Sequence, residues 1–319
     1  MQPTHTGQTV AAPVHARAVL VGARHGRRVD VERLTTIAFF LLPAAVVYSI
    51  FVLLPVFQAI YYSFFQWNGL GAPTDFVGFD NLVRVLGDTT FRNALSHNII
   101  ILVLSIALQL PLAFGLALLV NKGLRGKTVF RTIFFLPYVL SDVITGVVWN
   151  FIYKPENGLL NSILASVIPG FTPQGWLGNP QTVLGALFLV MTWKYFGLHL
   201  LLFLAALQDV PRELEEAAAI DGATRPQTIL RVIIPLMGNT ARLSVYLSAL
   251  GSLQIFDLVW VMTTGGPVGA SDTMATYMYK FGFQRFAIGY GSAVAIAIFV
   301  FCLGVSLIYQ RASRQSEFA

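Results

Sequence analysis

The side chains of this sequence that could bind or act on a polar molecule are few, and they lie inside long apolar segments. Asp142, Lys194 and Asp257 each interrupt such a segment, and Ser248 and Ser252 lie four residues apart in the segment that also holds Asp257. An ionised group inside a membrane costs at least about 2.5 kcal/mol unless it faces a partner or a cavity. We therefore expect these positions to pair with one another or to line a path for a polar solute.

Sets of side chains typical of catalysis are not recognisable in the sequence. His97 and His199 stand alone beside or within apolar segments, without a Ser-His-Asp or metal-ligand arrangement. The sequence GKT at residues 126–128 resembles the end of a phosphate-binding loop, but the first glycine of such a loop would fall at Asn121. We expect no catalysis, no cofactor and no metal on this chain.

The composition is that of a membrane protein. Of the 319 residues, 55% are hydrophobic and 11% are charged, whereas about 25% are charged in ordinary soluble domains. The net charge of +6 comes from short basic segments between apolar runs, which argues against nucleic-acid binding. The lone cysteine, Cys302, excludes a disulfide framework.

Six segments are long enough to cross a bilayer, which requires about 20 predominantly apolar residues in a helix. We predict an all-α protein with a basic, disordered tail at residues 1–33, a six-span domain at 34–311 and a second tail at 312–319. The predicted spans are residues 34–63, 97–120, 131–153, 182–207, 241–263 and 286–309.

The distribution of positive charge predicts the orientation of these spans. Of the 21 Lys and Arg residues, 15 fall on the side that holds both termini and five fall on the other side, with Lys194 inside a span. Because basic residues collect on the cytosolic side, both termini are predicted to lie in the cytosol, in a cell (plasma or inner) membrane.

The predicted cytosolic loop at residues 209–237 reads as two short helices. Asp209 can cap the first helix, and Gly222 supplies a left-handed stop. Thr224 can cap the second helix, with Pro226 in its first turn. From periodicity alone, docking into a groove of a partner protein and lying on the membrane surface are equally open.

The same loop resembles the EAA loop of ATP-binding-cassette (ABC) import permeases. The pattern of that loop is EAA, three residues, Gly, nine residues, then Ile, any residue and Leu-Pro. Similar residues occur here at the same spacing, at Glu216–Ala218, Gly222 and Val232–Pro235. The resemblance implies that the first helix is a coupling helix that docks on an ATPase subunit. The residues carried over to this role are Glu216, Ala217, Ala218, Asp221, Gly222 and Ala223.

Further segments resemble the MalF-like permeases of carbohydrate importers. They are LRGKTVFRTIFFLPYV at 124–139, KPENGLLN at 154–161, FDLVWVMTTGGP at 256–267 and GYGSA at 289–293. The resemblance implies the type I ABC importer permease fold, a second MalG-like permease, two copies of an ATPase that hold ATP and Mg, and an extracytoplasmic sugar-binding protein.

The resemblance also implies a substrate path in the fourth and fifth spans. Positions similar to the sugar site of maltose permeases are Lys194, Tyr195, Leu198, Ser248, Gly251, Ser252 and Ile255. Ordinary helix packing explains hydroxyl residues in membranes equally well. At 1.5 Å per residue, Asp142 and Lys194 lie about 16 and 18 Å deep in straight spans, so we expect them to meet, as an ion pair or as path-lining groups.

The function expected from these features is ATP-driven, binding-protein-dependent import of a sugar, an oligosaccharide by preference, through alternating access. One alternative is an ABC importer of glycerol phosphate or polyols, and another is an ion-coupled secondary sugar carrier. Anionic cargo favours Arg or Lys facing the path, and Lys194 is the one such residue available there, since Arg131 and Arg242 lie at the cytosolic ends of their spans. A secondary carrier would leave the EAA pattern without a role.

Overall fold

The computed structural model describes residues 31–121 and 126–315. The expected all-α class is confirmed, because the described residues form helices and no strand beyond an isolated antiparallel bridge between Phe65 and Phe76. The chain divides into two compact units, residues 1–54 and 55–319, and each is described by itself. Most of the predicted N-terminal tail lies outside the described residues.

The first unit contains helix α1 (Val31–Tyr48) and the π-helical turn η1 (Ser49–Leu53). Its apolar side chains are exposed, with Phe39 at 75% and Phe40 at 73% of their full accessible surface. A continuous apolar surface of this kind is unfavourable in water, and it costs nothing in hydrocarbon. This helix therefore has the surface of a membrane anchor.

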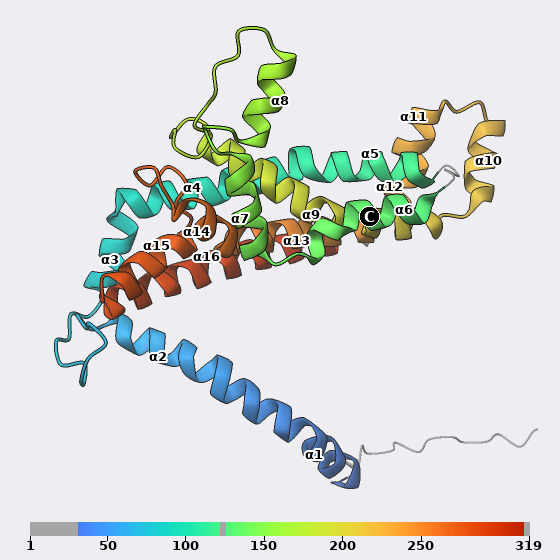
Figure 1. The fold of residues 1–319 in the computed structure, drawn as a ribbon. Coiled ribbons are helices and arrows are strands. Elements are labelled where there is room, and N and C mark those ends of the chain that lie inside the picture. The colour runs from blue at the N-terminus through green and yellow to red at the C-terminus, as the bar shows by residue number, and fades with distance from the viewer. Residues whose placement is uncertain (1–30, 122–125, 316–319) are drawn as a thin grey trace, which may run out of the picture. The chain divides into compact units, whose positions relative to one another are not determined.

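The second unit holds α2 and, from α3 onward, a bundle of helices formed by the described residues (Figure 1). In chain order the elements are α2 (Leu54–Ser63), α3 (Asp80–Gly87), α4 (Thr89–Leu104), η2 (Ser105–Gln109), α5 (Leu110–Asn121), α6 (Lys127–Val139), α7 (Asp142–Ile152), α8 (Leu159–Val167), α9 (Val183–Gln208), α10 (Arg212–Ile220), α11 (Arg225–Thr228), η3 (Ile229–Ile233), α12 (Ile234–Leu236), α13 (Gly238–Gln254), α14 (Asp257–Thr263), α15 (Met274–Tyr279), η4 (Lys280–Gln284) and α16 (Ile288–Gln315).

Four helical segments are long and apolar enough to cross a membrane unbroken, at residues 35–63, 89–121, 183–208 and 288–313. Two further spans arise if each bent helix pair counts as one, which are α6 with α7, bent by 99°, and α13 with α14, bent by 44°. The predicted third and fifth spans are therefore broken helices. Helix α16 runs to Gln315 and so includes the first four residues of the predicted C-terminal tail, 312–315.

Three π-helical turns share one local cause. Each of η1, η2 and η3 ends two residues before a proline, namely Pro55, Pro111 and Pro235. A proline ring clashes with the carbonyl four residues earlier and provides no N–H for it. That carbonyl lies inside the π-helical turn in each case, where the wider i to i+5 hydrogen bonding leaves room for the ring.

Helix α9 lies at the centre of this bundle, against α5 on one side and α6 on another. The contact with α6 is close, because a Cβ atom on Gly197 would lie 2.0 Å from the backbone oxygen of Phe134. Elsewhere α7 packs on α14, and α16 packs on α3. Figure 1 shows α10 and α11 at one end of this unit, with α3 and α15 at the other.

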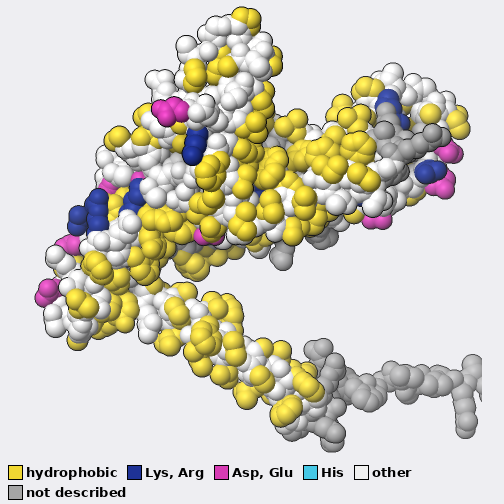
Figure 2. Space-filling view, in the orientation of Figure 1, with side chains coloured by type: hydrophobic (Ala, Val, Ile, Leu, Met, Phe, Trp, Pro, Cys, Tyr) yellow, Lys and Arg dark blue, Asp and Glu magenta, His cyan; other side chains and the backbone are white. Residues whose placement is uncertain are grey.

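Charge is distributed along this unit as a membrane protein requires. In Figure 2 the hydrophobic side chains cover the middle of the visible face of the bundle, while Lys, Arg, Asp and Glu gather mainly toward its ends. The end formed by α10 and α11 carries both signs of charge. An apolar belt between two charged ends is the arrangement expected of a chain that spans a bilayer.

Candidate functional site

The 209–237 loop folds as two short helices, α10 and α11, as the sequence predicts. Its first helix ends in a complete Schellman motif, in which the N–H of Gly222 donates to Ala219 O at 3.1 Å and that of Ala223 to Ala218 O at 2.9 Å. Gly222 has φ +77°, so the predicted left-handed stop is confirmed. Asp221 is the exposed C-cap residue.

The predicted cap of the first helix is wrong. Asp209 is the C-cap residue of α9, where its N–H donates to Ala206 O at 3.2 Å. Helix α10 begins three residues later at Arg212, behind Pro211, and its first turn has no side-chain cap. The acidic residues Glu213 and Glu215 in that turn still complement the positive end of the helix dipole.

The second helix starts as predicted. Thr224 is the residue before α11, and its backbone N–H and its hydroxyl both donate to Gln227 Oε1, at 2.7 and 2.9 Å. Across the turn, Arg225 Nη1 lies 3.8 Å from Glu215 Oε2, an exposed pair that contributes little to stability. The two helices are therefore ordered mainly by hydrogen bonds at their own ends, through the backbone in α10 and through the Gln227 side chain in α11.

Helix α10 has no buried residue among the described part of the chain. Ile220 is 86% exposed and Leu214 is 41% exposed, and Glu216 and Ala217 are exposed as well. Ala218 and Ala223 are half-buried. The candidate coupling positions thus lie together on a short helix whose apolar and acidic side chains are accessible to a partner.

Inside the bundle, Asp142 and Lys194 meet where α6 gives way to α7. Lys194 Nζ lies 3.1 Å from Asp142 Oδ1 and also donates to the backbone oxygen of Leu140. The predicted proximity of Asp142 and Lys194 is therefore confirmed. The third span is nevertheless bent, whereas the predicted depths of the two residues assumed a straight helix. Lys194 neutralises the C-terminal carbonyls of α6, and Asp142 occupies the first turn of α7, so each charge complements a helix dipole.

A cavity of about 140 Å³, open on part of its surface, lies beside this ion pair between α4, η2, α9 and α13. Six of the seven predicted path residues line it, whereas Lys194 does not. The lining residues are Ile101, Ser105, Gln109, Met191, Tyr195, Leu198, His199, Leu247, Ser248, Gly251, Ser252 and Ile255. Most of the predicted path residues therefore line one cavity, whereas Asp142 and Lys194 are not among the residues that line it.

Tyr195 connects the cavity to the ion pair. It lines the cavity, and its hydroxyl donates to Asp142 Oδ1 at 3.0 Å. Asp257, the third charge within a predicted span, is exposed in the first turn of α14 and is not among the cavity residues. The lining contains no Asp, Glu, Lys or Arg, and His199 is the one lining residue that can become positively charged.

His199 and Ser248 form the one hydrogen bond between two lining side chains among the described residues, with Nε2 and Oγ separated by 3.3 Å. Both residues are buried, and His199 Nδ1 has no hydrogen-bond partner among the described residues. Sequence reasoning named Ser248 as a path candidate. His199 could not be assigned to the path from the sequence, because a single histidine in an apolar run does not show which helix its side chain faces.

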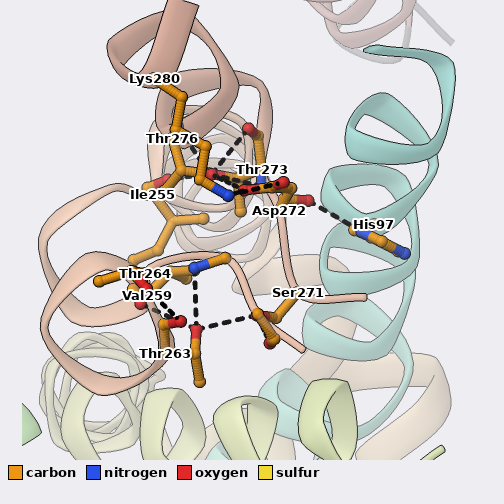
Figure 3. Close-up of polar contacts among 12 residues, drawn as sticks. His97, Ile255, Val259, Thr263, Thr264, Ser271, Asp272, Thr273, Thr276 and Lys280 are labelled. Atoms are coloured by element: carbon orange, nitrogen blue, oxygen red, sulfur yellow. Dashed lines mark hydrogen bonds and ion pairs between the residues drawn. The ribbon is translucent and has the colours of Figure 1, made fainter. Parts of the chain in front are cut away.

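The loop between α14 and α15 is held at one end of the bundle by buried polar contacts (Figure 3). Asp272 is 4% exposed, and its two carboxylate oxygens accept from Lys280 Nζ at 2.7 and 2.9 Å. His97 of α4 donates through Nδ1 to the backbone oxygen of Asp272 at 2.8 Å. The Thr273 hydroxyl donates to Ile255 O at 2.9 Å, which joins this loop to a residue of the cavity wall.

Asp88 anchors the neighbouring helix ends. Burial alone raises the pKa of Asp88, but hydrogen bonds from the Tyr277 hydroxyl and from the N–H groups of Thr90 and Phe91 bring that pKa below its ordinary value of 3.8. Burial, followed by hydrogen bonds with Tyr290 and Asp88, raises the pKa of Tyr277 well above its ordinary value. Asp88 thereby caps α4 and binds α15 at the same time.

The comparisons with known proteins agree on one kind of protein. The profile of the family described as "Binding-protein-dependent transport system inner membrane component" matches residues 109–316. The probable ABC transporter permease protein YurN of Bacillus subtilis is 33% identical over 274 residues, covering 85% of this chain and 94% of that protein.

Two further relatives have names that state a cargo. The diacetylchitobiose uptake system permease protein NgcF of Streptomyces coelicolor is 31% identical, covering 87% of this chain and 82% of that protein. The trehalose/maltose transport system permease protein MalF of Thermococcus litoralis is 31% identical, covering 86% and 92%. A chain in the crystal structure of a bacterial alginate ABC importer shares the fold, with a TM-score of 0.78, 24% identity and coverage of 90% and 97%.

Proposed function

Because this chain belongs to the family of binding-protein-dependent transport inner membrane components, we propose that it forms the translocation path of an ATP-driven sugar importer. Membership makes it a multi-pass membrane component of a transport system.

The observation that carries the proposal is the accessible helix α10. It presents Glu216, Ala217 and Ile220 without cover from the described residues, at the positions where the EAA pattern places its coupling residues. A helix that rests in a groove of a partner needs such a small, exposed and partly apolar face. We propose that this face docks on an ATPase subunit and receives the motion that ATP binding drives.

The ATP chemistry belongs to partner subunits in this proposal. Two copies of an ABC ATPase hold ATP and Mg, a MalG-like permease completes the path, and an extracytoplasmic sugar-binding protein delivers the cargo. Both termini and the 209–237 loop lie in the cytosol. The location of α10 and α11 at the end of the bundle opposite α3 and α15 supports this orientation.

A neutral sugar is the cargo that the cavity fits best. Its wall combines apolar side chains with hydroxyl, amide and imidazole groups, and its single acidic or basic member is His199. Sugars present hydroxyl groups and apolar ring faces to such a surface. The names of the relatives from Streptomyces and Thermococcus point to disaccharides of this kind.

An importer of glycerol phosphate would need fixed positive charge at the cargo site. Lys194 is the candidate for such a charge, and it is engaged by Asp142 and Leu140 outside the cavity lining. A polyol remains chemically similar to a sugar, so polyols belong in any test of cargo. Membership of the family argues against an ion-coupled carrier, since that mechanism has no use for an ATPase-docking loop.

The proposal is tested by purifying the complex through a tag on this chain and identifying each co-purifying subunit by mass spectrometry. We expect an ABC ATPase, a second permease and a binding protein, and the binding protein is then screened against sugars, polyols and glycerol phosphate. A stable complex without any ATPase would overturn the proposal. A binding protein that prefers glycerol phosphate would overturn the sugar assignment alone.

The docking role of α10 has its own test. Reversing the charge with Glu216→Lys is expected to reduce sugar-dependent ATP hydrolysis by at least about tenfold, because a repelled or misplaced docking helix breaks the coupling. Glu156→Lys, an equal charge change at an exposed position in the loop before α8, serves as the control. Equal activity of the two variants would exclude Glu216 from coupling.

A further inference from the structure

The cavity has a third wall that neither the sequence pattern nor the family resemblance assigns. Helix α4 and the π-helical turn η2 contribute Ile101, Ser105 and Gln109 to the lining. These three residues are spaced by four and lie opposite the wall residues of α9 and α13. The predicted path residues all come from α9, α13 and the residue that follows α13.

The polar side chains of this third wall have no hydrogen-bond partner among the described residues. Gln109 is 3% exposed and Ser105 is 5% exposed, and no hydrogen bond joins either side chain to another described residue. Their polar atoms are not among the fully buried atoms that lack a partner, so the small surface that remains accessible borders the cavity. Buried amides and hydroxyls are nearly always hydrogen-bonded, because leaving them without partners is unfavourable. Groups that are buried, lack partners and border a cavity are available to something that enters the cavity.

Local backbone geometry explains why both groups face the cavity. Residues four apart in a regular α-helix drift around its axis by about 40°, and the wider turn of a π-helix reduces this drift. Pro111 follows η2 by two residues and favours the widened turn, because its ring needs room at the carbonyl four residues earlier. Ser105 and Gln109 are the first and last residues of η2, so the proline-induced turn keeps both on the cavity side.

The chemistry of the two groups is specific for a neutral hydroxylated molecule. The Gln109 amide offers both an acceptor oxygen and a donor nitrogen, and the Ser105 hydroxyl can serve in either role. A sugar hydroxyl likewise donates and accepts, so it can satisfy an amide at both atoms. A carboxylate or phosphate only accepts, and the described wall offers no Lys or Arg to neutralise it.

We infer that Gln109 and Ser105 bind hydroxyl groups of the sugar during its passage and that Gln109 determines which sugars pass. This inference rests on the proposed function and adds a specificity wall to it. The site takes a neutral sugar unit between the η2 amide on one side and Ser252 with the His199 and Ser248 pair on the other.

The test uses the complete transporter in proteoliposomes, with uptake of maltose, trehalose, N,N′-diacetylchitobiose and xylose measured at saturating concentration. Saturation matters because the binding protein, and not this cavity, sets the concentration dependence. Gln109→Leu is compared with Gln58→Leu, which makes the same change at an exposed position of α2. Loss of one hydrogen bond corresponds to about a 2- to 10-fold lower rate.

We expect Gln109→Leu to lower the uptake of different sugars by different factors, so that the ratio between two transported sugars changes by at least about twofold. A purely structural role for Gln109 would lower every rate by the same factor and would overturn the inference. Gln58→Leu should leave all rates unchanged. If the unmodified complex takes up no sugar that its binding protein binds, the proposed sugar function is overturned together with this inference.

A second measurement does not depend on the folding of the leucine variant. Ser105→Cys and Ser96→Cys are each placed in a Cys302→Ala background, Ser96 being exposed on the same helix run. A transported sugar should slow the reaction of N-ethylmaleimide with the cysteine at position 105 and leave position 96 unaffected. Equal labelling at position 105 with and without a sugar that the complex transports would overturn the inference that Ser105 and Gln109 contact the sugar. The proposed function would be unaffected.

Discussion

Lys194 Nζ lies 3.1 Å from Asp142 Oδ1 across a helix break, and the same ammonium group donates to Leu140 O at the end of α6. The two helices that meet there, α6 and α7, are bent by 99°. The ion pair therefore joins the break to the central helix α9, and it places positive charge at the C-terminal end of α6 and negative charge at the N-terminal end of α7.

This geometry predicts an unequal effect of removing the two charges. Asp142→Asn leaves an ammonium whose side chain is 4% exposed, whereas Lys194→Met leaves a carboxylate that is 28% exposed and still accepts from Tyr195. Removing one partner of a fully buried pair costs about 3–5 kcal/mol, and we expect less here because Asp142 is partly solvated. Thermal unfolding of the detergent-solubilised chain should give a lower midpoint for Asp142→Asn than for Lys194→Met.

The double variant distinguishes pairing from independent roles. Asp142→Asn combined with Lys194→Met removes the uncompensated charge, so its unfolding midpoint should lie above that of Asp142→Asn alone. Lys154→Met, at an exposed position, controls for the loss of a lysine. Additive losses in the double variant would contradict direct pairing.

The contact of α6 with α9 predicts a severe effect of one added methyl group. A Cβ atom on Gly197 would lie 2.0 Å from Phe134 O and 2.9 Å from Phe135 Cα, and backbone atoms cannot yield as a side chain can. Overpacking a core typically costs about 1–3 kcal/mol, and occasionally more. Gly197→Ala should therefore lower the yield of folded protein in size-exclusion chromatography.

Gly185→Ala on the same helix is the matched control. A Cβ atom there would have no neighbour within 4 Å, and alanine favours a helix by about 1 kcal/mol over glycine. We expect this variant to be as stable as the natural chain or slightly more stable. Similar behaviour of the two variants would show that the α6–α9 contact relaxes easily.

The left-handed stop of α10 predicts an effect that depends on backbone conformation alone. Gly222 has φ +77°, and a Cβ atom at Gly222 or Gly238 would meet no heavy atom within 4 Å. Left-handed backbone costs about 1–2 kcal/mol for an L-residue, whereas Gly238 lies at the start of α13 without a positive φ. Gly222→Ala should reduce coupled ATP hydrolysis in the reconstituted complex, and Gly238→Ala should not.

Asp88 predicts a dependence of stability on pH. Its pKa is lower in the folded chain than the ordinary value of 3.8, so its contribution is fully present above that value and is lost as the pH falls through the folded pKa. Between about pH 5 and pH 3 the unfolding midpoint should fall less steeply in Asp88→Asn than in the natural chain. Asparagine retains the N-cap function, so parallel curves for the two proteins would exclude the titration of Asp88 as a cause.

Local features of the fold could be read from the sequence because their causes are local. The apolar runs predicted the membrane-crossing segments, since length and composition decide whether a helix can enter hydrocarbon. Gly222 and Thr224 predicted the ends of α10 and α11, because a left-handed residue and a capping box act within a few residues. Asp209 was assigned to the wrong helix, since a capping residue belongs to whichever helix is adjacent, and α9 runs to Gln208.

The breaks and the cavity wall required the tertiary structure. The 99° bend between α6 and α7 has no unambiguous signal in an apolar run, because Pro137 is tolerated within α6, and the meeting of Asp142 with Lys194 depends on that bend. Ser105 and Gln109 line the same cavity as Ser252 and His199 because α4, η2, α9 and α13 pack together, which the sequence does not show. The sequence by itself thus determined the kind of protein and its docking loop. The tertiary structure decided which polar side chains face the path, because that depends on contacts between helices that are far apart in the chain.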